Sequence, residues 1–220
     1  MAGIFQFGEE VAGYEIPVLN EREIRAAAGL LFVLMLVSVL VVGFKWEFTL
    51  LKYATTLFLT DILIRVLINP RFSPALILGR LIVRNQVPEY VGAPQKRFAW
   101  IIGILLASAM FVQLVVLNLH NPINGIICMI CLLFLFFETS FGICLGCLVY
   151  PWFFGEKSQH CPGEVCEPKE RQPIQKISLV QILILAFFAG YIFLIAQSFH
   201  HEFSQQPKLV LGMKRPPQNR

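Results

Sequence analysis

Charged residues are scarce in this chain. Of its 220 residues, 15% are Asp, Glu, Lys or Arg and 56% are hydrophobic. Soluble domains usually carry about 25% charged residues, so this composition excludes an ordinary soluble domain and indicates that lipid is the solvent. The formal net charge of +4 is small and unevenly distributed, which is typical of a membrane topology signal rather than of a nucleic-acid-binding surface.

Motifs that would name a reaction are also absent. The sequence contains no hydrolase, nucleotide-binding or haem-attachment signature, so it implies no particular cofactor and leaves open whether the protein is an enzyme. A cleavable signal is missing as well, because the first apolar run begins only near Ala26 and follows an acidic segment. We therefore expect membrane insertion to use the first transmembrane helix itself.

Five long apolar runs are present, and each is close to the roughly 20 residues that an α-helix needs to cross a bilayer. They cover residues 26–44, 50–68, 98–119, 126–150 and 177–199. Short connections join the first run to the second and the third to the fourth, so each pair should form an antiparallel hairpin. The sequence predicts an all-α polytopic membrane protein in which two hairpins build a four-helix domain over residues 26–150 and a fifth transmembrane helix follows.

Polar segments surround these runs. Residues 1–25 form a polar N-terminal segment in which Asn20 can cap the first helix. Residues 151–176 form a loop that contains two cysteines, and residues 200–220 form a basic tail. These segments are too short and too polar to predict a further folded domain.

The loop between the two hairpins, residues 69–97, is strongly basic. Its only acidic residue is Glu89, and its basic residues are Arg71, Arg80, Arg84, Lys96 and Arg97. By the positive-inside rule this loop faces the cytoplasm, which places the N-terminus in the cytoplasm too. Residues 74–85 are too short to span the membrane and put Arg80 and Arg84 one turn apart. We therefore expect a helix in the membrane interface, with the arginines of this loop directed at lipid phosphates.

The fourth run ends in a CxxC sequence. On a continuous helix Ser140, Cys144 and Cys147 lie at i, i+4 and i+7, so both thiols share a face with a hydroxyl group near the cytoplasmic end. Gly142 and Gly146 have GxxxG spacing on an adjacent face, which favours close helix packing. The thiols are therefore a candidate redox pair or, alternatively, small packing residues. A position near a helix C-terminus disfavours the thiolate, unlike the N-terminal position of thioredoxin-type pairs.

Four further cysteines are present. Cys161 and Cys166 flank a Pro-Gly turn in the following loop, so they can form a second redox pair. Together with the first pair they also resemble the ligand spacing of a four-cysteine zinc or iron–sulfur site. Cys128 and Cys131 form another CxxC near the outer end of the fourth run. They are interpreted as packing residues, with a transmembrane thiol relay as the alternative.

Charged side chains inside the apolar runs form the remaining candidate site. Asp61 and Arg65 lie at i and i+4 on the second run, where they can neutralise each other. Glu138 lies near the middle of the fourth run without a partner in its own helix, so it should be protonated or paired across helices, and Arg65 is the nearest cation by depth. Such buried groups form structural bonds or relay protons.

Several separated motifs coincide with a known pattern. The sequences DILIR at 61–65, NPRFSP at 69–74, KRFA at 96–99 and FGICLGCLVY at 141–150 resemble a bacterial family of four-helix integral membrane proteins of unknown function. The resemblance covers about residues 18–150 and implies a location in the bacterial cytoplasmic (inner) membrane. Members are sometimes fused to, or encoded beside, thioredoxin-like or rhodanese-like domains, which implies such a partner. The matching positions are Asp61, Arg65, Arg71, Ser73, Arg97, Cys144 and Cys147.

Three functions follow as hypotheses. The first is a membrane component of thiol-redox or sulfur handling that uses Cys144 and Cys147, with Cys161 and Cys166 as a second pair. The second is a non-catalytic accessory or assembly subunit of a larger membrane complex, since short loops and close helix packing fit that role equally well. The third is a metal-handling membrane protein in which the same four cysteines bind the ion.

Overall fold

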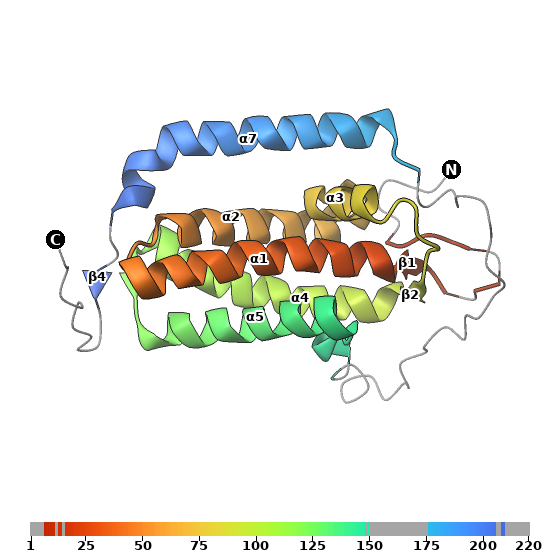
Figure 1. The fold of residues 1–220 in the computed structure, drawn as a ribbon, viewed down its shortest axis with the longest axis horizontal. Helices are drawn as coiled ribbons and strands as arrows, with labels where there is room; N and C mark the ends of the chain where they lie inside the picture. Colours follow the sequence, from red (N-terminus) through yellow and green to blue (C-terminus); the bar gives the residue numbers. More distant parts are fainter. Residues whose placement is uncertain are drawn as a thin grey trace.

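The main feature of the computed structural model is a set of long helices that run side by side (Figure 1). The structure describes residues 7–11, 13–14, 16–147, 149, 176–205 and 208–209. The long helices are α1 (Glu21–Lys45), α2 (Thr49–Leu63), α4 (Ala93–Phe111), α5 (Pro122–Phe141) and α7 (Leu179–Ser204). Turns of π-helix continue α2 over Ile64–Ile68 and α4 over Val112–Val116, and a 3-10 turn, Pro70–Phe72, leads into the short helix α3 (Pro74–Ile82).

Four helices in the described part of the chain are long and apolar enough to cross a membrane: Glu21–Lys45, Ala93–Val116, Pro122–Phe141 and Leu179–Ser204. Most of their side chains are not buried inside the protein, as expected for helices surrounded by lipid. The predicted second span is also helical, but α2 and its continuation contain three charged residues, Lys52, Asp61 and Arg65. Helix α2 itself has 15 residues and is shorter than the other four. The four long apolar helices indicate an α-helical membrane protein.

Local capping signals explain where the helices begin. The side chain of Asn20 accepts a hydrogen bond from the backbone N–H of Arg22 at 3.2 Å, which confirms the predicted cap of α1. Asn121 does the same for α5 by accepting from the N–H of Asn124 at 2.9 Å, and Pro122 follows as the first helical residue.

The end of α5 differs from the prediction. The fourth apolar run was predicted to be helical to residue 150, but α5 ends at Phe141 because Gly142 adopts a left-handed conformation with φ 65°. The N–H of Gly142 donates to the Glu138 carbonyl at 3.1 Å, and the N–H of Ile143 to the Phe137 carbonyl at 3.1 Å, the pattern of a Schellman cap. The chain therefore turns out of the helix before it reaches the cysteines.

Helix α1 lies at the centre of the bundle and packs against α2, α3 and α5. Two clusters of buried hydrophobic residues surround it. One lies at the end where α1 begins and includes Ile24, Leu31, Phe58, Ile62 and Trp100. The other lies toward the opposite end and includes Met35, Phe48, Leu51, Leu114 and Leu132.

Helix α3 corresponds to the helix that was predicted for the membrane interface. It runs alongside α1 and α2 (Figure 1) and buries most of its residues. Gly79 permits this contact, because a side chain there would come within 3.1 Å of the Ala27 backbone nitrogen. Arg80, predicted to face lipid phosphates, is only 5% exposed and forms an ion pair with Glu23 of α1 at 3.0 Å. Arg84 is exposed beyond the end of the helix.

Short strands, which the all-α prediction did not include, pair at each of the two ends of the bundle. β1 (Val18–Asn20) pairs antiparallel with β2 (Tyr90–Gly92), so the entries to α1 and α4 are fixed next to each other. β3 (Leu119–His120) pairs in parallel with β4 (Lys208–Leu209) at the opposite end. One end of the bundle contains the beginning of α1, the end of α5 and the beginning of α7 (Figure 1).

Helix α7 is attached mainly near its two ends. Near its beginning, the Gln181 amide donates to the Arg71 carbonyl at 3.1 Å. Near its end, the buried Lys52 donates to the Gln205 carbonyl at 2.7 Å and to Asn118 Oδ1 at 2.8 Å. No motif in the sequence singled out Lys52, yet its side chain links α2, the segment after α4 and the end of α7.

Candidate thiol site

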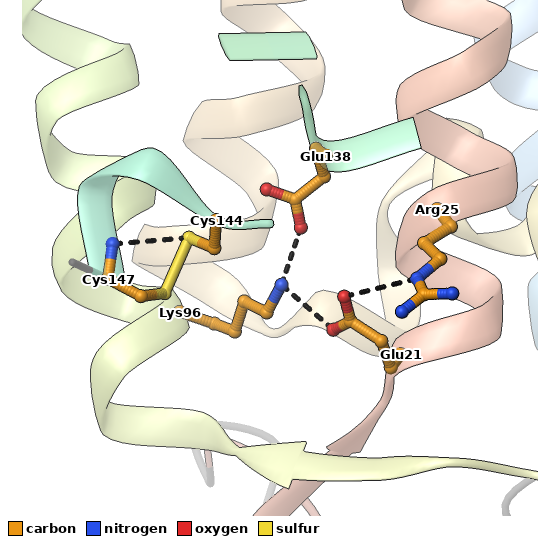
Figure 2. The surroundings of a disulfide bond; sticks show 6 residues. All are labelled: Glu21, Arg25, Lys96, Glu138, Cys144 and Cys147. Atoms are coloured by element: carbon orange, nitrogen blue, oxygen red, sulfur yellow. Dashed lines mark hydrogen bonds and ion pairs between the residues drawn. A yellow bond between two sulfur atoms is a disulfide. The ribbon is translucent and has the colours of Figure 1, made fainter. Parts of the chain in front are cut away.

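Cys144 and Cys147 form a disulfide just after the chain leaves α5 (Figure 2). Their Cα atoms lie 5.1 Å apart, within the usual range for a disulfide. Cys144 comes immediately before a helical turn that contains Cys147. The N–H of Cys147 donates to the Cys144 carbonyl at 3.0 Å and approaches its Sγ at 3.3 Å.

This geometry corrects the predicted environment of the thiols. The break at Gly142 places Cys144 at the beginning of a new turn, with its Sγ next to the Cys147 N–H, rather than near the end of a long helix. It also separates the thiols from Ser140, which is exposed on α5. Cys144 is 9% exposed, whereas Cys147 is partly exposed.

The two glycines of the GxxxG sequence have different roles. Gly142 ends α5, and a side chain at this position would collide with the guanidinium group of Arg25. Gly146 lies against α4, where an added Cβ would approach the Ala99 Cβ to 2.6 Å. Gly146 is therefore a close-packing residue as predicted, but the two glycines do not form one helix face. Because Gly146 contacts Ala99, the turn with the two cysteines lies against the first part of α4.

A buried ionic cluster lies at the same end of the bundle (Figure 2). The Lys96 Nζ of α4 lies 2.5 Å from the Glu138 Oε1 of α5 and 2.8 Å from the Glu21 Oε2 of α1. The Lys96 side chain is 1% exposed. Arg25 lies 3.6 Å from the other oxygen of Glu21. Two carboxylates are therefore balanced by two cations, as buried charges require.

The predicted partner of Glu138 was wrong. Arg65 has a similar depth, but its guanidinium binds Asp61, with an Nη2–Oδ2 distance of 2.6 Å. The i,i+4 pair of Asp61 and Arg65 is thus confirmed, and it leaves Lys96 to neutralise Glu138. Lys96 was predicted only as a basic loop residue, because the third apolar run begins at Phe98, whereas α4 already begins at Ala93.

Asp61 also organises the loop that follows α2. Its Oδ1 accepts hydrogen bonds from the Ser73 hydroxyl at 2.7 Å and from the Ala75 N–H at 2.8 Å. Arg65 lies over the ring of Trp100, with its Cζ 5.2 Å from the ring centre. This buried network joins α2, the beginning of α3 and α4, which gives the motif residues Asp61, Arg65 and Ser73 a structural role.

Arg71 and Arg97, two other arginines that were predicted to face the membrane interface, have side chains next to the N-terminal segment. Arg71 is partly exposed and lies 3.6 Å from Glu9. Arg97 lies over the ring of Phe7, with its Cζ 5.3 Å from the ring centre. Both side chains hold residues that precede α1 against the end of the bundle.

A cavity connects the thiol site with the interior of the bundle. Its volume is about 70 Å³, and Cys144, Glu138 and Arg65 lie on its wall. Cys131, one of the two free cysteines buried in α5, lines it as well. Its other walls are mostly apolar and include Ile24, Ala28, Leu31, Phe58, Trp100 and Leu135. No sequence signal pointed to this cavity, because it forms where four helices meet.

The second cysteine pair, Cys161 and Cys166, lies outside the described residues. In the part of the chain that the structure describes, no three or more His, Cys, Asp or Glu side chains are grouped so that they could hold a metal ion. The metal hypothesis needs Cys161 and Cys166 in addition to Cys144 and Cys147, so it stays a prediction from the sequence.

Comparison with known proteins gives one match. The family described as Domain of unknown function (DUF4395) matches residues 19–154, more than half of the chain. The matched region contains α1 to α5, the ionic cluster and the Cys144–Cys147 pair, and it excludes α7. No curated protein and no solved structure matches the sequence.

Proposed function

Since the chain belongs to the DUF4395 family, whose function is unknown, we propose from its site that it is a membrane component of thiol-redox or sulfur handling. The observation that carries this proposal is the geometry of the cysteine pair. Cys144 and Cys147 form a disulfide at the start of a helical turn, the position at which thioredoxin-type pairs gain a reactive thiolate. Packing residues on a continuous helix would have no reason to adopt this arrangement.

The exposure of the two sulfurs suggests how the pair reacts. Cys147 is partly exposed, whereas Cys144 is buried. A thiolate of a partner protein would attack Cys147 Sγ, the Cys144–Cys147 bond would break, and Cys144 would leave as a thiolate next to the Cys147 N–H. A second thiol of the partner would then displace Cys147, so that the partner is oxidised and the pair reduced. A thioredoxin-like or rhodanese-like protein has suitable chemistry.

The ionic cluster supports the same function. Thiol–disulfide exchange releases and takes up protons, and Glu138 lines the same cavity as Cys144. Its contact with Lys96 provides a buried acid–base pair at the cavity wall. We assign Lys96 and Glu138 as positioning residues that keep this end of the bundle closed and polar beside the thiols.

The distribution of basic residues supports an orientation of the protein in the membrane. The positive-inside rule places the segment between α2 and α4 in the cytoplasm. The end of α5, which the cysteine pair follows directly in the chain, lies at the same end of the bundle as this segment (Figure 1). We therefore propose that the protein lies in the bacterial inner membrane with its N-terminus and the Cys144–Cys147 pair on the cytoplasmic side.

Trapping of the partner tests this function. In cells, Cys144→Ser should accumulate a mixed disulfide between Cys147 and the oxidised form of the partner, because in the reverse of the exchange Cys147 attacks the partner's disulfide and Cys144, the thiol that would release the partner, is missing. Cys147→Ser is the matched control and should trap at least tenfold less, since the remaining Cys144 is buried. The adduct is isolated after acid quenching and alkylation, and mass spectrometry identifies the linked peptides. If neither variant forms a reducible adduct, the proposed exchange does not occur.

A non-catalytic accessory subunit is the second candidate, and α7 favours it. This helix lies outside the matched family region and exposes many large apolar side chains, among them Leu183, Phe187, Phe193 and Leu194. Its attachment near the two ends leaves most of that surface to lipid or to a helix of another protein. Copurification of one stoichiometric partner in mild detergent would support this candidate, and loss of that partner on deletion of α7 would locate the contact.

A further inference from the structure

A groove lies between α7 and the rest of the bundle, toward the end of the molecule opposite to the end of α5. Its volume is about 590 Å³, within the range of about 300–1,000 Å³ that is typical of ligand sites. Its walls come from α2, from the end of α4 and the π-helical turn that follows, and from the second half of α7. Because α7 runs along the outside of the bundle (Figure 1), the groove is reached from the lipid.

The groove has about the length of one half of a bilayer. Tyr191 and Phe203 are the first and last residues of α7 that line it, and a helix rises about 18 Å between these positions. Half of the hydrocarbon core of a membrane is about 15 Å thick. Near the middle of α7, the hydroxyl groups of Tyr191 and Thr60 lie 3.4 Å apart, so a contact with α2 closes the groove there. Apolar side chains line its length, among them Phe111, Val115, Ile195 and Phe199.

Two opposite charges lie at the other limit of the groove, where α7 ends. Glu202 and Gln205 form one wall there, and Asn118 lies on the wall as well. The buried Lys52 donates to Asn118 Oδ1 at 2.8 Å and to the Gln205 carbonyl at 2.7 Å, so its ammonium group lies directly behind the wall. Both acceptors are neutral. In the described part of the chain, neither Lys52 nor Glu202 forms an ion pair with an oppositely charged side chain.

A ligand with an apolar chain and a zwitterionic head matches this groove. We propose that the groove binds phosphatidylethanolamine, with one acyl chain between α7 and the bundle, its phosphate toward Lys52 and its ammonium group at the Glu202 carboxylate. A buried charge without a counter-charge is costly, and the phosphate supplies that counter-charge to Lys52. A primary ammonium group, like that of lysine, has three N–H donors and can therefore hydrogen-bond to Glu202. The inference does not depend on the thiol function, because it involves other residues at the other end of the bundle.

Native mass spectrometry tests the choice of lipid. The full-length protein is depleted of lipid in detergent and titrated separately with phosphatidylethanolamine, phosphatidylcholine and phosphatidylglycerol that carry the same acyl chains. We expect one tightly bound phosphatidylethanolamine for each chain, with an affinity about fivefold higher than for the other two lipids. Choline has no N–H donor, and phosphatidylglycerol has no cation for Glu202. Equal affinities for the three lipids would overturn the proposed head-group site.

A groove-filling variant tests the location. Ile195 lines the groove, so Ile195→Trp should weaken the binding of phosphatidylethanolamine about tenfold, because the indole ring takes the space of the acyl chain. The neighbouring Leu194 is 62% exposed and is not part of the groove wall, so Leu194→Trp is the matched control and should bind as the unsubstituted protein does. Equal binding by the two variants would overturn the assigned groove.

A charge variant tests the role of the carboxylate. Glu202→Gln should remove the preference for phosphatidylethanolamine over phosphatidylcholine and leave the binding of the acyl chain in place. Glu47 is exposed between α1 and α2 at the same end of the bundle, so Glu47→Gln is the matched control and should keep the preference. A preference that survives in Glu202→Gln would contradict the contact with the ammonium group.

Photocrosslinking maps the bound chain directly. Phosphatidylethanolamine with a photoreactive group at the end of one acyl chain should crosslink near Tyr191, where the groove closes. The same probe in Ile195→Trp should lose this crosslink. Crosslinks spread evenly over the lipid-facing sides of all the long helices would show only general contact with lipid and would overturn the inference.

Discussion

Replacing Lys96 by Met is expected to lower the free energy of unfolding by about 3–5 kcal/mol, because it removes one partner from a buried ionic cluster. The Lys96 side chain is 1% exposed and lies between Glu21 and Glu138. Met has a similar length, so packing is largely kept while two buried carboxylates lose their shared cation. The change is measured by denaturant titration in mixed micelles.

Two further variants test whether the lower stability of Lys96→Met comes from its unpaired buried carboxylates. Lys45→Met changes an exposed lysine at the end of α1 and should shift the stability by less than about 0.5 kcal/mol. Combining Lys96→Met with Glu21→Gln and Glu138→Gln removes the unpaired charges and should restore at least half of the loss. A Lys96→Met protein as stable as the unsubstituted one would show that the cluster does not hold this end of the bundle together.

Replacing Gly142 by Val is expected to disrupt the thiol site itself. The left-handed φ of 65° at this position is costly for a β-branched residue, by about 1–3 kcal/mol, and a side chain there would displace Arg25. If α5 then continues in helical conformation, Cys144 and Cys147 lie on a helix, where the backbone holds their sulfurs apart. We expect a several-fold smaller disulfide fraction in a fixed glutathione buffer, measured by mass-tag alkylation.

The matched control for this variant is Gly125→Val. Gly125 is also in α5, has no atom within 4 Å of an added Cβ and does not have a positive φ. It should therefore leave both stability and the disulfide fraction nearly unchanged. Equal behaviour of the two variants would contradict the role given to the turn at Gly142.

The sequence was sufficient to predict the class of fold and several local features. Apolar runs of membrane-spanning length, the cap at Asn20 and the Asp61–Arg65 pair depend on spacing along one helix, and spacing is visible in a sequence. The family resemblance likewise rested on short motifs, and the matched family covers residues 19–154.

The candidate site was harder to predict, for physical reasons. Gly142 lies in an apolar run, and glycine is tolerated within transmembrane helices, so the break after Phe141 had no clear sequence signal. Depth suggested Arg65 as the partner of Glu138, but pairing between helices also depends on how each helix is rotated about its axis. The burial of Arg80 likewise depends on Glu23, which is 57 residues away in the chain.

Site-resolved alkylation of the cysteines in intact cells and in inverted membrane vesicles tests the central claim most directly. We expect Cys147 to react only after reduction, and to react in inverted vesicles but not from the outside of intact cells. The buried Cys128 and Cys131 should stay unmodified in both. Full modification of Cys144 and Cys147 without reduction, or no modification after it, would contradict a redox-active pair on the cytoplasmic side.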